Sequence, residues 1–281
     1  MNFYKELELV LEAKNPTEKI EAFEKFYSAY KAGAMKFEKE FVSKKFSEPS
    51  YSSICQIVNP QNVPRRSNLT TKEGQIILLH AILHIEYSAI DLALDAAYRF
   101  SHKCQSEAIN VWVPKQYCDD WLEVAEDEIR HFLMLEALLH ELGASYGDVE
   151  VHNSLFEASQ RTQTLIERMA VVPRYLEANG LDATPMILEK LKRLPKNEML
   201  KKIVDTLEII LHEEIEHVKK GDIWFNWACE ARGKSPDVYF EIIEKYYPQG
   251  FLRAKNLNTD ARKEAGFSCK ELNFMAKREV C

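Results

Sequence analysis

The segment 76–97 restricts the fold of this chain more than any other feature, because it is nearly all apolar and yet has a glutamate at its centre. Its polar residues other than Glu86 are His80, His84, Ser88, Asp91 and Asp95. At about 100° per residue, these five share one helix face, roughly 120–200° away from Glu86. We expect His80 and His84 at the surface or in a second layer. Glu86 is alone on the apolar face, where a carboxylate must be protonated, paired with a cation or bound to metal.

Two later segments repeat this anomaly, and each adds a histidine three residues after the glutamate. The pairs are Glu128 with His131 and Glu214 with His217. On a helical projection, both glutamates lie in an apolar stripe. The stripe residues are Trp121, Val124, Phe132, Leu135 and Leu139 in the first segment, and Leu200, Ile203, Leu207, Ile210, Val218 and Phe225 in the second.

This spacing is suited to metal binding. Residues i and i+3 are neighbours on a helix, so a carboxylate and an imidazole can point to the same place. Two such pairs, with one glutamate from each of two further helices, supply six ligands to two metals, as in the di-iron and di-manganese sites of ferritin-like bundles. The alternative is that the charges are paired or face solvent without metal.

The ligand from the third helical segment is less well determined. The candidates are Glu157, Glu167 and Glu177. Glu177 follows Pro173, which lacks an N–H and should bend the helix locally. Loop lengths do not fix the level of the metals along the helices, so spacing alone gives Glu177 only a small preference over Glu167.

An acidic residue stands directly before each motif glutamate, namely Asp127 in the first motif and Glu213 in the second. A metal-bound histidine usually donates its second N–H to a carboxylate. We therefore expect Asp127 and Glu213 to lie just outside the ligands, where they could reach the histidine of the facing helix.

The chain is predicted to be all-α, because it shows neither alternating strand patterns nor a repeat of 20–50 residues. Four long helices are expected at about residues 70–101, 119–142, 152–179 and 197–232. The first opens with the capping-box pattern Thr70-x-x-Glu73, and Gly143, Gly180 and Gly233 mark the ends of the others.

Shorter helical pieces are expected on both sides of these four. Asn15 and Pro16 are typical of a helix start, and another short helix should begin near Ser235. Residues 46–70 contain three prolines and predict an extended connection. The predicted organisation is an N-terminal helical arm with its connection (1–70), a four-helix bundle (71–233) and a C-terminal helical extension packed on the bundle (234–281).

Composition and charge narrow the class of protein. Residues 73–249 carry 31 acidic and 18 basic groups, which should repel nucleic acid outside local basic patches. No secretory signal or transmembrane helix is expected. No C-x-x-C spacing occurs, so we expect a cytoplasmic protein with reduced thiols. The cysteines are Cys55, Cys104, Cys118, Cys229, Cys269 and Cys281.

Four segments resemble an uncharacterised bacterial family of ferritin-like proteins, known mainly as a domain of unknown function. They are LLHAILHIEYSAIDLALDA, YCDDWLEVAEDEIRHF, VPRYLEANGLDATP and HEEIEHVKKGDIWF, and the similarity covers roughly residues 55–265. The resemblance implies a ferritin-like four-helix bundle that binds two iron ions, or manganese. The implied ligands are Glu86, Glu128, His131, Glu177, Glu214 and His217.

The Asp-Glu-x-x-His form is also similar to that of bacterial multicomponent monooxygenases and of ribonucleotide reductase small subunits. In those proteins the acid before the glutamate lies just outside the ligands. Glu213 departs from this pattern, because it replaces the aspartate in the second motif. The segment around Glu177 is also similar to the tRNA-hydroxylase and quinone-hydroxylase branches.

We therefore expect an O₂-dependent oxidoreductase or hydroxylase with an unidentified substrate, an electron donor and no membrane partner. The protein should be a monomer or small homo-oligomer. Its pocket walls would be Ile82, Ile90, Phe132 and Leu135. One alternative is iron or peroxide handling without an organic substrate, and another is a metal that only holds helices together.

A tRNA substrate is a further alternative that the sequence does not favour. Basic residues gather near the start of the fourth helix and in a small patch at Arg65 and Arg66. The first group is Lys190, Lys192, Arg193, Lys196, Lys201 and Lys202. Solvated lysines on an acidic protein explain this pattern more simply.

Overall fold

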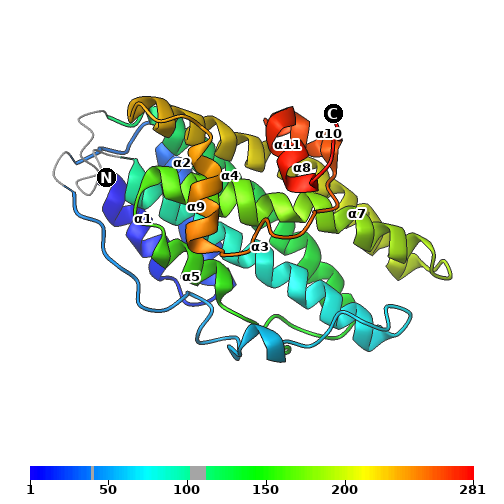
Figure 1. The fold of residues 1–281 in the computed structure, drawn as a ribbon. Coiled ribbons are helices and arrows are strands. Elements are labelled where there is room, and N and C mark those ends of the chain that lie inside the picture. Colours follow the sequence, from blue (N-terminus) through cyan, green and yellow to red (C-terminus); the bar gives the residue numbers. More distant parts are fainter. Residues whose placement is uncertain (39–40, 102–111) are drawn as a thin grey trace. The chain divides into compact units, whose positions relative to one another are not determined.

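The computed structural model describes residues 1–38, 41–101 and 112–281, and within these ranges every regular element is helical (Figure 1). Two isolated β-bridges join Asn2 to Lys36 and Ile57 to Val151. The prediction of an all-α chain is therefore confirmed. The chain divides into two compact units, Met1–Glu157 and Ala158–Cys281, and each is described by itself. Cys104 lies outside the described residues.

The first unit is built on two long helices that pack against each other, α3 (Lys72–Phe100) and α4 (Lys115–Glu141). An N-terminal pair, α1 (Phe3–Glu12) and α2 (Pro16–Lys31), lies beside them, and α1 packs on α3. The connection from α2 to α3 contains one short 3₁₀ turn, η1 (Pro60–Asn62). Helices are therefore present where the first two long helices were expected, although α4 begins at Lys115 and not near residue 119. The predicted division into an arm, a bundle and an extension stays a prediction.

Capping side chains set the starts of two of these helices. Asn15 caps α2 as predicted, because its Oδ1 accepts a hydrogen bond from the backbone N–H of Glu18 at 2.9 Å. Helix α3 starts one residue later than predicted. Thr71, and not Thr70, is its N-cap, and Thr71 Oγ1 accepts a hydrogen bond from Gly74 N at 3.1 Å.

The polar face of α3 is covered within the first unit. Asp91 on this face lies 2.7 Å from Lys19 Nζ and accepts a hydrogen bond from Ser50 Oγ at 2.6 Å. Helix α2 and the connection after it therefore cover this face. His80 and His84 are also buried. The expected surface placement of these histidines is therefore wrong, and a place in a second layer stays a prediction.

The second unit contains the end of α5 (Ser154–Arg161) and seven further elements. They are α6 (Leu165–Val171), the π-helical segment η2 (Val172–Glu177), α7 (Ala178–Lys192), α8 (Glu198–Ala231), α9 (Val238–Tyr246), α10 (Thr259–Glu264) and α11 (Cys269–Ala276). Helix α8 packs against α6, η2 and α7. It begins at the predicted cap, Asn197, and ends before the left-handed Gly233 (φ +61°).

The prediction of one continuous third helix ending at Gly180 is wrong. The chain leaves the helix after Arg161, and Thr164 starts α6 with a capping box to Glu167. Gly180 lies inside α7, which continues to Lys192. A glycine marks a helix end when the backbone there turns left-handed, and Gly180 is not among the glycines with positive φ.

A buried arginine connects the C-terminal helices to α8. Arg174 Nε lies 2.8 Å from Asp222 on α8, and its Nη2 donates a hydrogen bond to Glu271 on α11 at 2.8 Å. Its guanidinium also lies over the rings of Phe225 and Tyr239, at 4.7 and 4.5 Å. The carboxylates and rings compensate for burial of the charge. Within its unit, the predicted extension therefore packs on α8.

Two further expectations concern thiols and membranes. Cys269 and Cys281 are joined by a disulfide, so the expectation that all thiols are reduced is wrong for this pair. Their spacing matches no cysteine motif, and the fold of the C-terminal segment brings them together. By length and composition α3 could cross a membrane, but 72% of its apolar window is buried, as in a core helix. The cellular location stays a prediction.

Candidate metal centre

Within the first unit, Glu86 on α3 meets Glu128 and His131 on α4. His131 Nδ1 lies 3.2 Å from Glu86 Oε2 and 3.6 Å from Glu128 Oε2. Potential ligand atoms of the three residues all lie within 4.8 Å of one another. The three side chains are buried, and His131 is 0% exposed. This carboxylate–histidine cluster could hold a metal ion.

The two carboxylates determine the charge of His131. Burial lowers the pKa of its imidazole, but hydrogen bonds to Glu128 and Glu86 raise it, and the resulting pKa is about 11. Without metal, the ring is therefore protonated and donates from Nδ1 to Glu86. Since histidine binds metal as the neutral imidazole, a metal must displace this proton.

Aromatic residues directly follow Glu86 and His131 in the sequence. Tyr87 follows Glu86 in the sequence, Phe132 follows His131, and the two rings lie 5.3 Å apart. The side chains predicted as pocket walls are all buried: Ile82, Ile90, Phe132 and Leu135. Low-dielectric surroundings strengthen the attraction between a cation and carboxylates. That these side chains line a substrate pocket stays a prediction.

The second Glu-x-x-His motif lies on α8 of the second unit. Glu214 Oε1 is 3.3 Å from His217 Nδ1, so the i, i+3 spacing brings these groups together. His217 is buried, whereas Glu214 is partly exposed. The third predicted ligand of this unit, Glu177, is the last residue of η2 and is also partly exposed.

Two contacts establish the level of Glu177 along α8. Lys192 at the end of α7 lies 2.5 Å from Glu208 on α8. Earlier in the chain, Pro173 lies so close to Gly221 that a Cβ added at residue 221 would be 2.3 Å from Pro173 Cβ. The two segments therefore run antiparallel. This register places Glu177 about one turn from the Pro173 contact, level with the second motif.

Sequence analysis missed both the π-helical segment and the role of Gly221. Pro173 cannot donate a backbone hydrogen bond, and the chain around it takes up the wider π-helical turn. Such segments are frequent at functional sites. The available signal for Gly221 was a glycine inside a long helical pattern, which often marks close packing.

Glu167 is occupied by other contacts. Its Oε2 accepts hydrogen bonds from Thr164 N and Oγ1 at 3.3 and 3.0 Å, and its Oε1 accepts one from Lys245 Nζ at 2.6 Å. Burial raises the pKa of this carboxyl group. These hydrogen bonds and one from Tyr246 lower the pKa by a larger amount, so it lies below the usual value for glutamate. Glu157 is exposed. The geometry therefore favours Glu177 as the ligand.

The acids that precede the two motifs are both partly exposed. Asp127 Oδ1 accepts a hydrogen bond from Arg130 Nη2, one turn later on α4, at 2.6 Å. Glu213 is placed on α8 beside the second motif. That either acid reaches the histidine of a facing helix stays a prediction.

Comparison with known proteins finds relatives that match nearly the whole length of the chain. The model of a family described as "Protein of unknown function (DUF455)" matches residues 12–273. An uncharacterized protein of Haemophilus influenzae is 36% identical over 282 residues, which cover 99% of this chain and 94% of that protein. No solved structure matches the chain.

Proposed function

The chain belongs to the DUF455 family of proteins of unknown function, and we propose that it is a dimetal carboxylate protein with a ferritin-like arrangement of its long helices. A dinuclear site of this kind takes four carboxylates and two histidines. Two iron ions would occupy it, with manganese as the alternative. The proposed ligands are Glu86, Glu128, His131, Glu177, Glu214 and His217.

The observation that carries this proposal is the buried contact of His131 with Glu86 and Glu128. It is one half of the expected ligand set, and α3 and α4 alone position it. The second unit offers a matching half, with the second motif on α8 and Glu177 at its level. Four carboxylates and two histidines are more than a structural metal needs.

We propose that the activity is an O₂-dependent oxidation or hydroxylation of an unidentified substrate, supported by an external electron donor. Two Fe(II) ions held by the six proposed ligands would supply electrons for the reduction of O₂. The residues of the chain would hold the metals between carboxylates and imidazoles and exclude water. The buried Ile90, Phe132 and Leu135 suit the last of these tasks.

An anaerobic Fe(II) titration followed by exposure to O₂ tests this proposal. Metal analysis should approach two ions per chain, and O₂ should change the absorbance of the loaded protein. Metal should also raise the melting temperature, because it neutralises carboxylates that crowd one another without it. The control is Glu167→Gln, which should still bind two metals. A plateau at one ion or none would contradict the dinuclear site.

The same protein also distinguishes the alternative of iron or peroxide handling. With a large excess of Fe(II), an oxidase should turn over its two bound ions once and then stop until a reductant is added. Mass determination in solution should find a monomer or small oligomer. A cage-sized particle that keeps the excess iron soluble would replace the oxidase proposal with iron handling.

A further inference from the structure

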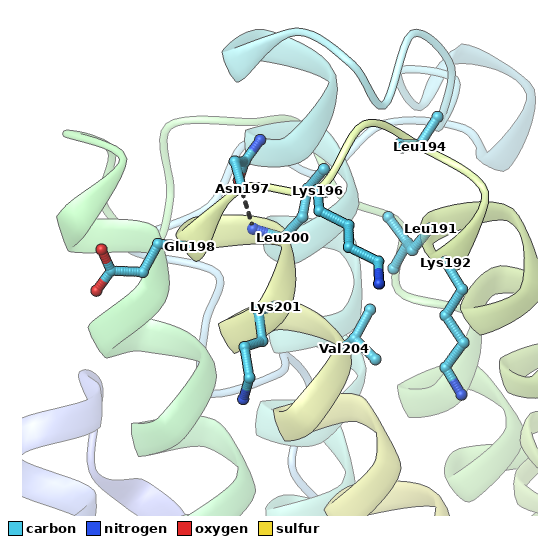
Figure 2. A pocket seen from close by; sticks show the side chains of 9 residues that line it. All are labelled: Leu191, Lys192, Leu194, Lys196, Asn197, Glu198, Leu200, Lys201 and Val204. Carbon is cyan, nitrogen blue, oxygen red and sulfur yellow. Dashed lines mark hydrogen bonds between the residues drawn. The ribbon is translucent and has the colours of Figure 1, made fainter.

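A pocket of about 740 Å³ opens in the second unit where α7 ends and α8 begins (Figure 2). We call it the tip pocket. Its wall is mainly apolar and includes Leu191, Leu194, Leu200 and Val204. This volume and lining are typical of small-molecule sites, which combine an apolar hollow with a few polar groups.

Lys196 supplies the charge at this hollow. Its side chain extends between Leu191 of α7 and Val204 of α8 (Figure 2). Among the residues that the structure describes, Lys196 has no ion-pair partner. The other charged residues of the wall are Lys192, Lys201 and Glu198, and each forms an ion pair. The ammonium group of Lys196 beside apolar side chains is therefore complementary to a ligand with an anionic head and an apolar body.

Four of the neighbouring basic residues form ion pairs with acids on the same two helices. The ion pairs are Lys192–Glu208, Arg193–Glu189, Lys201–Asp205 and Lys202–Glu198. A nucleic-acid backbone binds best to a row of available cations, so the surroundings of the tip pocket favour a small ligand over RNA.

The N-terminus of α8 is also satisfied without a ligand. Asn197 Oδ1 accepts a hydrogen bond from the backbone N–H of Leu200 at 2.8 Å, drawn as a dashed line in Figure 2. The anionic group of a ligand would therefore meet the ammonium group of Lys196 and not the end of the helix.

We propose that the tip pocket binds a small amphiphilic carboxylate, with its apolar chain in the hollow and its carboxylate on Lys196. Val204 precedes Glu214 by ten residues on α8, a rise of about 15 Å along the helix axis. The tip pocket is therefore separate from the proposed metal ligands. The inference stands on the pocket alone and does not depend on the proposed function.

Displacement of the anionic dye anilinonaphthalene sulfonate by decanoate tests this inference, because the dye fluoresces when it enters an apolar site. Decanoate should compete with the dye below its micelle concentration. Decanol should bind about fivefold more weakly, because it lacks the ion pair. Octanoate should bind about tenfold more weakly than decanoate, because it buries two fewer methylene groups.

Two variants and a control assign the binding to this pocket. Lys196→Gln should weaken decanoate about fivefold and leave decanol unchanged. Val204→Trp should fill the hollow and abolish dye binding without changing the helical circular dichroism. Lys190→Gln removes an exposed lysine of α7 that does not line the pocket, and it should change nothing.

Three results would overturn the inference. Equal affinity for decanoate, decanol and decylammonium would remove the role of the ammonium group. Dye binding that survives both Lys196→Gln and Val204→Trp would place the site elsewhere. Displacement of the dye by RNA or by an acidic peptide, but not by decanoate, would mean that the surface serves a macromolecule instead.

Discussion

The two Glu-x-x-His motifs are alike in sequence but differ in what supports them. His131 lies beside Glu86 of α3, a single uninterrupted helix. The motif on α8 packs against a chain that changes from α-helix to π-helix and back between Leu165 and Lys192. The pairing of two regular helices, α3 and α4, determines the first arrangement, whereas the second also needs Pro173 and Gly221. Spacing along one helix therefore identifies a pair of ligands. It does not determine which residue of a neighbouring helix lies beside that pair.

The largest expected effect comes from removing a glutamate of either motif. If both motifs serve one site, Glu128→Ala and Glu214→Ala should each reduce bound iron from two ions per chain to one or none, because each removes a ligand or bridge. Metal analysis after Fe(II) loading measures this. Glu123→Ala, at an exposed position of α4, is the matched control. Loss of metal in only one variant would show that the motifs act separately.

Much of the fold could be predicted because its main helices follow local rules. The apolar stripe of α4 and the caps at Asn15 and Asn197 depend on residues that are close in sequence. The breaks around α6 and η2 could not be predicted in the same way. Gly180 has the same side chain as Gly233, and only the packed backbone decides which of them turns left-handed.

The site was predictable to a similar extent. Glu86 was found because it interrupts an apolar face, and its contact with His131 follows from the pairing of α3 with α4. The choice of Glu177 over Glu167, which the family resemblance implied, could not be made from helix spacing alone. It depends on a register that Pro173 and Gly221 set by close packing, and on the contact of Glu167 with Lys245, which is distant in sequence.

Acid should destabilise the first unit by protonating two buried histidines of α3, His80 and His84. Burial lowers the pKa of His80 and of His84 to about 4 from 6.5. His84 Nε2 lies 2.9 Å from the carbonyl oxygen of His152, and its Nδ1 lies 2.9 Å from the Tyr146 hydroxyl. Since the unfolded state binds more protons between pH 6.5 and 4, this stability is complete above about pH 6.5 and is lost as the pH falls toward 4.

Urea unfolding of the metal-free protein at pH 7.5 and pH 5 measures this loss. The free energy of unfolding should fall by about 2 kcal/mol for each of the two histidines. His84→Asn cannot titrate in this range, so between the two pH values the variant should lose about 2 kcal/mol less stability than the parent protein, whatever its stability at pH 7.5. An unchanged pH dependence in this variant would contradict the assignment.

The second unit should be sensitive to one methyl group at Gly221. Gly221→Ala would place a Cβ 2.3 Å from Pro173 Cβ and 2.4 Å from its Cγ, so η2 and α8 must move apart. Overpacking of this kind costs about 1–3 kcal/mol, and the shift should weaken metal binding by moving Glu177. Gly180→Ala is the control, because no neighbouring atom lies within 4 Å of its added Cβ.

The two glycine variants should change stability in opposite directions. Alanine at residue 180 replaces a helical glycine and should stabilise the protein by about 0.5–1 kcal/mol. Thermal unfolding and iron stoichiometry of the two variants, measured side by side, check this prediction. If Gly221→Ala binds two irons with unchanged affinity, the close contact of η2 with α8 is not what positions the ligand.

The smallest expected effect concerns the acids that precede the motifs. If Asp127 orients a metal-bound histidine, Asp127→Asn should keep both metals but weaken their binding or slow iron oxidation about 10–100-fold. Asp127 also accepts a hydrogen bond from Arg130 at 2.6 Å, and an exposed ion pair of this kind contributes at most about 1 kcal/mol. Arg130→Gln removes that pair and keeps the Asp127 carboxylate, so it should reproduce the effect of Asp127→Asn if the pair is all that matters.

Glu213→Gln, measured in parallel, extends the comparison to α8. A slowing as large as that of Asp127→Asn would mean that the longer side chain performs the same task, and no slowing would mean that only the first motif needs a carboxylate behind its ligands.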